Sequence, residues 1–350
     1  MNKSASYLLL LIFVLFSCTS NQKSKKIKVT FHLNNAAQRI DVLTDGSIFT
    51  TYRWTENITK PVSYPICTSS GTMITRGFPI EPKAGERADH PHQIGMWFTY
   101  GNVNGLDFWG NGSQGLGTTN PNGGLIKHQK IEDVKEGNGE GTFTSEESWQ
   151  DTTGIELLHE KTQYHFIADG KMRIIDRRTT LTAGQSDVSM PDTKEGMFGL
   201  RVARQLELPD DGNIVLYNAD GTTTRTRDTL NIGISGDYRS SEGITGLDVW
   251  GTRARWMDLH GKIGEENISI VICDHPSNPN YPTYWHARGY GLFAANPLGV
   301  KDFTNGAESL NFSIPAGESV TFRYRVIFYS GESLSVDDIN KLADEFALTK

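Results

Sequence analysis

Short stretches in which hydrophobic and polar residues alternate recur along the chain, separated by glycine, asparagine, aspartate and proline. In residues 321–329, Phe322, Tyr324, Val326 and Phe328 alternate with mostly polar positions. A period of two turns one face toward a core and is typical of a half-buried β-strand. Further strands are predicted at 46–54, 73–78, 142–149, 161–167, 171–181, 197–208 and 267–273. The pattern therefore predicts a mostly β protein.

One helix is predicted, at the C-terminus. Ser335 can cap its first turn, and Leu334 and Ile339 can form a hydrophobic staple across that cap. Ile339, Leu342 and Phe346 share one face, which we expect to pack against a sheet. No block repeats at a fixed period. The expected fold is a β-sandwich or supersandwich with a C-terminal helix.

The first residues have the order of a signal peptide, with Lys3 followed by an apolar run. Leu15 and Ser17 before Cys18 resemble a lipobox, in which the cysteine is lipidated and the chain is cut just before it. An ordinary secretory leader cut nearby is the alternative. We expect a lipoprotein signal peptide at 1–17, a polar tether at 18–30 and a single large β domain at 31–350. The protein would then be exported and lipid-anchored to a bacterial membrane, in the periplasm or at the cell surface.

Net charge, cysteine content and missing motifs exclude several classes of partner and activity. The chain has 350 residues and a formal net charge of −7, and no basic tract follows the tether, so we expect no nucleic-acid partner and membrane contact through the lipid anchor only. Beyond Cys18 the cysteines are Cys67 and Cys273, which form one disulfide or stay as buried free thiols. Serine-esterase, P-loop and dinucleotide-binding motifs are absent from the sequence.

The string Asp-His-Pro occurs twice, at 89–91 and 274–276, and each copy has a second histidine nearby. An imidazole titrates near neutral pH and can act as acid, base or ligand, although a single such string is also a common turn. Because there are two copies beside aromatic residues, we predict a site. The predicted catalytic residues are His90, His92 and His275, and the predicted substrate-binding residues are Asp274, His286, Trp97, Tyr284 and Trp285.

Charged residues at strand ends extend this candidate site. Glu195 precedes a predicted strand and is assigned as a general base or ligand. Arg201 and Arg255 are assigned to substrate binding, because a guanidinium can clamp a carboxylate or polarise a carbonyl. His90 and His92, with Glu195 as a third ligand, also fit a divalent metal. The cofactor therefore remains unknown, and a metal is an alternative that we do not favour.

Several longer strings carry a family resemblance. They are Arg76-Gly77-Phe78-Pro79, Asp89-His90-Pro91-His92-Gln93, residues 101–109 and residues 274–297. Together they resemble the family named "methane oxygenase PmoA family protein", over about residues 71–331. The family's motif has a second histidine where this chain has Gln93. The resemblance implies a soluble β-sandwich lipoprotein, similar to galactose mutarotases and often encoded by bacteria that degrade glycans.

Three functional hypotheses follow. The first is an enzyme that acts on a carbohydrate or sugar derivative by proton transfer next to a carbonyl or anomeric centre, as a mutarotase, epimerase or lyase does. The second is a non-catalytic glycan-binding lipoprotein that uses the same cleft. The third is a metal-dependent oxygenase, in line with the family's name. We favour the first, because histidines, a glutamate and arginines occur together with aromatic residues.

Overall fold

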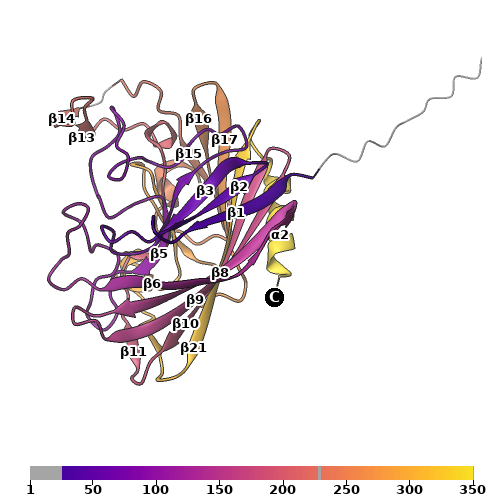
Figure 1. The fold of residues 1–350 in the computed structure, drawn as a ribbon. Coiled ribbons are helices and arrows are strands. Elements are labelled where there is room, and N and C mark those ends of the chain that lie inside the picture. Colours follow the sequence, from indigo (N-terminus) through magenta and orange to yellow (C-terminus); the bar gives the residue numbers. More distant parts are fainter. Residues whose placement is uncertain (1–25, 228–229, 350) are drawn as a thin grey trace, which may run out of the picture.

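The computed structural model describes residues 26–227 and 230–349. The expected signal peptide and the lipidation site at Cys18 lie outside this range. No helix in the described part is long and apolar enough to cross a membrane. Figure 1 shows two twisted sheets packed face to face, with a helix near the C-terminus behind one of them.

Two large antiparallel sheets make up the molecule (Figure 1). Sheet A contains, in spatial order, β18 (Tyr284–Ala287), β19 (Leu292–Asn296), β12 (Gly196–Arg201), β5 (Met96–Tyr100), β4 (Val62–Ile66), β3 (Ser47–Arg53), β2 (Arg39–Thr44), β1 (Lys28–Asn34) and β7 (Gly137–Asn138). Sheet B contains β15 (Asp237–Ser240), β16 (Trp256–Ile263), β17 (Glu266–Asp274), β21 (Ser319–Ser330), β10 (Met172–Ala183), β9 (Glu156–Asp169), β8 (Glu140–Gln150) and β6 (Leu125–Lys135).

Smaller elements complete the described chain. Two short antiparallel pairs join β11 (Val188–Met190) to β20 (Phe312–Ile314) and β13 (Asn213–Tyr217) to β14 (Thr223–Arg227). The helical elements are η1 (Arg204–Leu206), η2 (Gly246–Val249), α1 (Val300–Phe303) and α2 (Val336–Ala347). The mostly β sandwich with a C-terminal helix is confirmed. Strand β1 begins at Lys28, within the stretch expected to be a tether.

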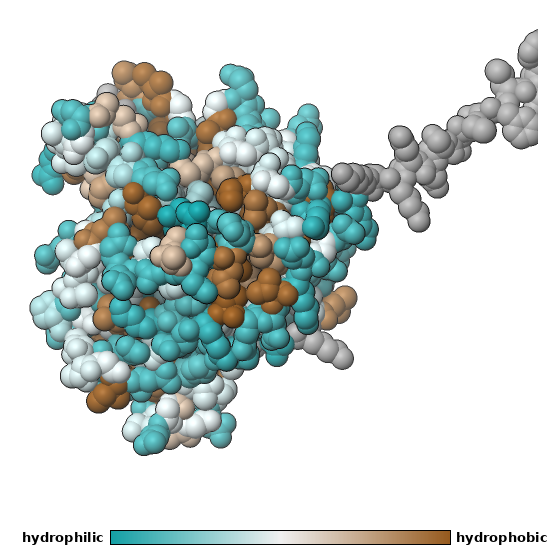
Figure 2. Space-filling model, viewed as in Figure 1, coloured by the Kyte–Doolittle hydropathy of each residue, from teal (hydrophilic) through white to brown (hydrophobic). Residues whose placement is uncertain are grey.

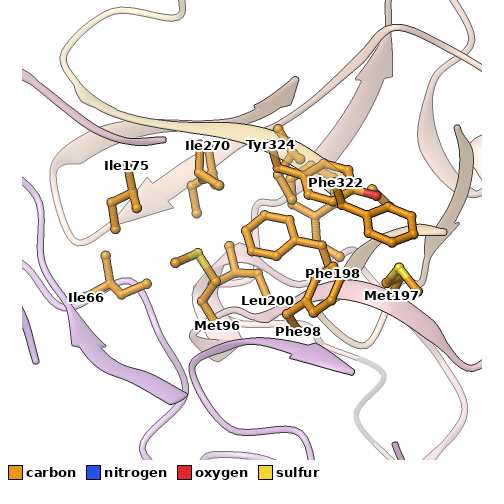
Figure 3. Close-up of a cluster of buried hydrophobic side chains, with 14 of the residues drawn as sticks. Ile66, Met96, Phe98, Ile175, Met197, Phe198, Leu200, Ile270, Phe322 and Tyr324 are labelled. Atoms are coloured by element: carbon orange, nitrogen blue, oxygen red, sulfur yellow. The ribbon is translucent and has the colours of Figure 1, made fainter. Parts of the chain in front are cut away.

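The core lies between the two sheets and is built from the inward positions of their alternating patterns. Figure 3 shows Phe98 and Phe198 of sheet A against Phe322 and Tyr324 of sheet B. The rings of Phe198 and Tyr324 are stacked, with centroids 4.9 Å apart. Burial of such aromatic rings contributes about 1.5–3 kcal/mol each to folding. Because Phe98 and Phe198 point into this core, the opposite face of sheet A points away from it.

Helix α2 covers the other face of sheet B (Figure 1). The Ser335 hydroxyl accepts a hydrogen bond from the Asp338 amide at 3.1 Å, as the cap prediction requires. Ile339 and Phe346 are buried against the sheet, which confirms the predicted apolar face. The surface seen in Figure 2 is largely hydrophilic, with hydrophobic residues in scattered groups.

Two strand predictions need correction. Residues 73–78 make only isolated bridges, because the amides of Gly77 and Phe78 donate to the Glu86 carboxylate instead of to a neighbouring strand. The strand predicted at 197–208 ends at Arg201, and the 3-10 helix η1 follows it. Cys67 and Cys273 are both buried free thiols, so of the two alternatives the structure has the unpaired one.

Candidate functional site

The outer face of sheet A carries most of the candidate residues. Trp97 lies between Met96 and Phe98 in β5, and since side chains alternate along a strand it points away from the core that its neighbours fill. Loops 54–61, 71–95 and 101–124 cover this face and pack on it through a second apolar cluster. That cluster consists of Ile58, Val62, Tyr64, Ile94, Trp97, Trp109, Leu292 and Ala294.

One row of side chains crosses four strands of this face. In register, His286 of β18 pairs with Ala294, Ala294 with Gly199, and Gly199 with Trp97. The two middle residues are small, so the Trp109 indole has room above them. A Cβ added to Gly199 would lie 2.6 Å from the Trp97 ring and 3.1 Å from the Trp109 ring. The indole of Trp109 in turn stacks with the His286 ring, with centroids 6.4 Å apart.

A buried arginine holds the first Asp-His-Pro loop. The Arg76 guanidinium is 1% exposed and donates to the carbonyl oxygens of Asp89 at 2.8 Å, His90 at 3.0 Å and Gln93 at 3.0 Å. It also donates to the Arg87 carbonyl at 3.2 Å. Backbone carbonyls from four positions therefore converge on one side chain. This is why the loop from Arg87 to Gln93 has a defined shape without being a strand.

Arg201 locks the same loop to sheet A. It is fully buried at the end of β12 and donates to Asp89 Oδ1 and to Gln93 Oε1, each at 2.6 Å. Asp89 Oδ1 also accepts from Arg76 at 2.7 Å. Burial by itself would raise the pKa of Asp89, but Arg201, Arg76 and a hydrogen bond with His90 hold it well below the usual range. Asp89 is therefore ionised at any physiological pH.

His90 is presented to solvent by this scaffold. Its backbone adopts a left-handed conformation with φ of 42°, and its side chain is 42% exposed. The ring lies flat on the Tyr290 ring, 5.0 Å apart with a 4° tilt, and its Nδ1 is 3.4 Å from Asp89 Oδ1. Arg201 covers the same Tyr290 ring. Left-handed backbone is uncommon for histidine and is maintained here by the Arg76 contacts.

His286 lies on the same face as a neutral ring. Its Nδ1 is 2.8 Å from the Lys194 carbonyl, so the proton sits on Nδ1 and Nε2 is free to accept. Burial, together with Arg288, lowers the pKa of His286 to about 3. Arg288 follows two residues later, and its guanidinium lies over the Trp250 ring. His90 is also close enough to His286 to lower its pKa.

His92 and Lys60 line a narrow pocket beside the first loop, together with Asn111 and Pro91. Burial followed by the charge of Lys60 lowers the pKa of His92 to about 2, so this ring is neutral. Within the described chain no group bonds to His92 Nδ1, which is buried. Lys60 is 3% exposed and donates to the Trp109 carbonyl at 3.1 Å.

Several predicted residues do come together. His90, His92, Arg201, His286 and Trp97 all lie on the outer face of sheet A. Glu195 immediately precedes β12 and follows Lys194, whose carbonyl accepts the hydrogen bond from His286 Nδ1. The Glu195 carboxylate pairs with Lys194 Nζ at 3.2 Å. The rings of His90 and His92 are 5.8 Å apart.

The second Asp-His-Pro string lies elsewhere. The His275 ring packs edge-on against Phe346 of α2, on sheet B, and its Nδ1 bonds to Ser277. Asp274 accepts from Asn278 Nδ2 and from the Thr283 amide, each at 2.7 Å. Here the turn interpretation holds, because these contacts cap the segment that crosses from sheet B to sheet A.

The other predicted substrate ligands have structural contacts. Arg255 binds Asp344 at 2.5 Å and Asn340 at 2.6 Å, and so fastens α2 to sheet B. Trp285 points into the core and donates to the Ala254 carbonyl. Tyr284 does lie on the outer face of sheet A, where its ring stacks on Phe303. The expectation that both strings face one cleft is not supported by these positions.

The sequence patterns predict no site role for Arg76, Lys60, Tyr290 or Arg288. Arg76 enters the sequence prediction only as part of a family string. The residues next to a buried arginine do not reveal which distant groups it binds. For the metal alternative, no group of three or more His, Cys, Asp or Glu residues gathers within 26–227 and 230–349 closely enough to hold an ion.

A family model matches most of the chain. Residues 39–344 match the model of a family of unknown function, DUF6807. The chain belongs to this family. Among curated proteins, none is significantly similar to this DUF6807 protein.

Solved structures with partial similarity to the DUF6807 protein include three sugar-related proteins. An alpha-galactosidase from Lactobacillus brevis is 10% identical, with a TM-score of 0.41 over 86% of this chain and 40% of that one. A putative aldose 1-epimerase from Escherichia coli K12 is 9% identical, with a TM-score of 0.32 over 87% and 99%. A galactose mutarotase-like protein from Clostridium acetobutylicum is 9% identical, with a TM-score of 0.34 over 88% and 99%. The chain spans about two fifths of the length of the galactosidases it matches.

Proposed function

We propose that the outer face of sheet A binds a carbohydrate or sugar derivative and that His90 transfers a proton next to its carbonyl or anomeric centre. The arrangement of His90 supports this proposal best. Its exposed ring is held flat by Tyr290, and the Asp89 carboxylate lies 3.4 Å from its Nδ1. A carboxylate at Nδ1 orients an imidazole and leaves Nε2 for the substrate, which is the arrangement a general base needs.

His286 is the proposed second contact to the sugar. Its Nδ1 proton is engaged by the Lys194 carbonyl, so its Nε2 can accept a hydrogen bond from a sugar hydroxyl. Its pKa of about 3 keeps the ring neutral, so in this proposal it orients the sugar while His90 exchanges the proton.

Aromatic rings around these histidines support a sugar as the ligand. Tyr290 and Trp250 are half-buried, and aromatic rings with a polar neighbour suit the alternating apolar faces and hydroxyl edges of a sugar. His90 and Arg288 are the polar neighbours of these two rings. The TM-scores of the sugar-related structures are below 0.5, so the proposal rests on these side chains.

The test is turnover of a panel of reducing sugars and glycosides, followed by NMR for anomeric exchange and solvent-deuterium incorporation and by ultraviolet absorbance for elimination products. These readouts separate the three reactions. His90→Ala should lower the rate by about 100-fold or more, the usual contribution of a positioned acid or base. His159→Ala, which removes a 39% exposed imidazole from sheet B, is the matched control.

A wild-type rate in His90→Ala would refute the catalytic role. Sugar binding without any product in the wild type would instead favour the glycan-binding hypothesis. We also propose, from the leader sequence, that the protein is exported and lipid-anchored through Cys18. Loss of the protein from the membrane fraction on Cys18→Ala would support the anchor.

A further inference from the structure

We propose that the protein has a second binding site, a cavity at the edge of the sandwich in which His128 hydrogen-bonds a small neutral polyhydroxylated ligand such as one sugar residue. The cavity lies between the loop that follows β3 and strand β6, so its walls differ from those of the site around His90. Its volume is about 190 Å³, and its lining includes Gln38, Trp54, Thr55, Ile58, Ile126 and His128. The second site does not depend on the function proposed for His90.

A row of titratable side chains leads from this cavity into the core. In register, His128 of β6 lies opposite Glu147 of β8, and Glu147 lies opposite Glu160 of β9. The two glutamates are 1% and 2% exposed, and Glu147 shares its face of β8 with the core residue Trp149. The side chain of His128 is 7% exposed. His128 therefore stands between the cavity and two buried carboxylates.

Glu160, the inner carboxylate, is compensated by its own neighbours. Its Oε1 accepts from Arg177 Nη2 and from the Thr162 hydroxyl, each at 2.6 Å. Its Oε2 accepts from the Trp149 indole at 2.8 Å. Three donors, one of them a cation, therefore satisfy Glu160 without His128.

Glu147, the outer carboxylate, has fewer partners. Its Oε1 accepts from the Tyr52 hydroxyl and lies 3.5 Å from His128 Nδ1, within ion-pairing distance. In the described parts of the chain nothing bonds to its buried Oε2. A buried carboxylate is costly without compensation, so Glu147 favours a proton on the Nδ1 that faces it.

The other ring nitrogen of His128 is the one that a ligand can reach. Of the two nitrogens only Nδ1 is both buried and unbonded, and within 26–227 and 230–349 no protein group bonds to Nε2. The ring itself is held in place, because it stacks on the half-buried Trp54 ring with centroids 4.1 Å apart. A fixed imidazole with a carboxylate behind Nδ1 thus presents Nε2 to the cavity.

The remaining walls suit a sugar ring or a polyol. Ile58 and Ile126 supply apolar surface beside the Trp54 indole. The side-chain oxygen of Gln38 accepts from a loop amide at 3.2 Å, which leaves its NH₂ group as a donor on the wall. Apolar surface with a few placed hydrogen-bonding groups is what a small-molecule site needs.

Charge and size narrow the ligand class. A hydroxyl both donates and accepts, so it can meet Nε2 whether the His128 ring is neutral or protonated. An anion would be repelled by the Glu147 carboxylate behind that ring. The cavity of about 190 Å³ is far larger than the roughly 10–15 Å³ that one water needs, and smaller than the roughly 300 Å³ of sites for drug-sized ligands. A neutral ligand of about one sugar ring fits these limits.

The experiment follows the His128 ring by NMR in the full chain, with isotope-labelled histidine. Methyl glucoside, methyl galactoside and myo-inositol would be titrated in turn, and the His128 signals would be assigned by their loss in His128→Gln. We expect at least one probe to shift these signals saturably, and equally in His90→Ala. In calorimetry, His128→Gln should weaken binding of that probe about tenfold, as expected for one lost hydrogen bond to a polarised group. His159→Gln, at a 39% exposed imidazole of β9, should leave it unchanged.

The wild-type titration keeps the proposal falsifiable even if His128→Gln fails to fold. Absence of a saturable shift at His128 with every probe would overturn the second site, and so would wild-type affinity in a folded His128→Gln. Turnover that depends on His90 without binding at His128 would overturn this inference alone. Binding at His128 without any turnover would overturn the proposed function alone.

Discussion

Arg76 Nη2 donates to the carbonyl oxygen of His90 at 3.0 Å, so a fully buried guanidinium holds the backbone of an exposed histidine. Arg201 completes the scaffold through the Asp89 carboxylate. These two buried arginines, one in loop 71–95 and one at the end of β12, therefore position the ring that faces solvent. Changes far below the surface should alter the site.

The first prediction concerns Arg76. Arg76→Met should lower the free energy of unfolding by about 3 kcal/mol, because it removes one partner of a buried ion pair and one donor from each of four backbone carbonyls. Urea unfolding measures the change. Arg227→Met, which breaks a pair whose side chains are 62% and 82% exposed, should cost under about 1 kcal/mol. Equal effects of the two changes would contradict the role of Arg76.

The second prediction concerns Gly199. Gly199→Ala should displace the Trp97 and Trp109 rings, since the new methyl carbon would lie 2.6 Å from the first ring. Overpacking of this kind costs about 1–3 kcal/mol. Tryptophan fluorescence and thermal unfolding would report it. Gly184→Ala is the control: its new methyl group would meet only ordinary contacts, so the fluorescence should stay unchanged. Gly154→Ala is unsuitable as a control, because the backbone φ at Gly154 is positive.

The third prediction concerns Asp274. Burial raises its pKa to about 7, although bonds from Asn278 and Thr283 act in the opposite direction. A carboxyl whose pKa is raised on folding binds its proton more tightly in the folded state, so its contribution to stability is lost as the pH rises from about 4 to 7. Asp274→Asn should therefore lose less stability than the wild type over that range, measured by urea unfolding at pH 5 and pH 7. Parallel pH profiles of the two proteins would show that Asp274 is already ionised in the folded state.

Local patterns predicted much of the fold. The alternation in 321–329 and 267–273 corresponds to β21 and β17, and Ser335 caps α2 as expected. Such features depend on neighbours within a few residues, which the sequence contains. Residues 73–78 were also predicted as a strand but form none, because the Glu86 carboxylate accepts the amides of Gly77 and Phe78.

The candidate site was predicted in part. His90, His92, Arg201 and His286 were identified from residue type and clustering, and the structure brings them to one face. Arg76 and Lys60 were missed, because their importance lies in burial and in partners that are distant in sequence or contributed by a backbone carbonyl.

By itself the sequence determined the alternating strands, the capped C-terminal helix and the presence of two Asp-His-Pro strings. Only the tertiary structure decided that these strings differ, since His90 lies on Tyr290 over sheet A and His275 lies under Phe346 on sheet B. The physical reason is that a turn is set by its own few residues, whereas its chemical surroundings are set by strand pairing and burial between residues far apart in the chain.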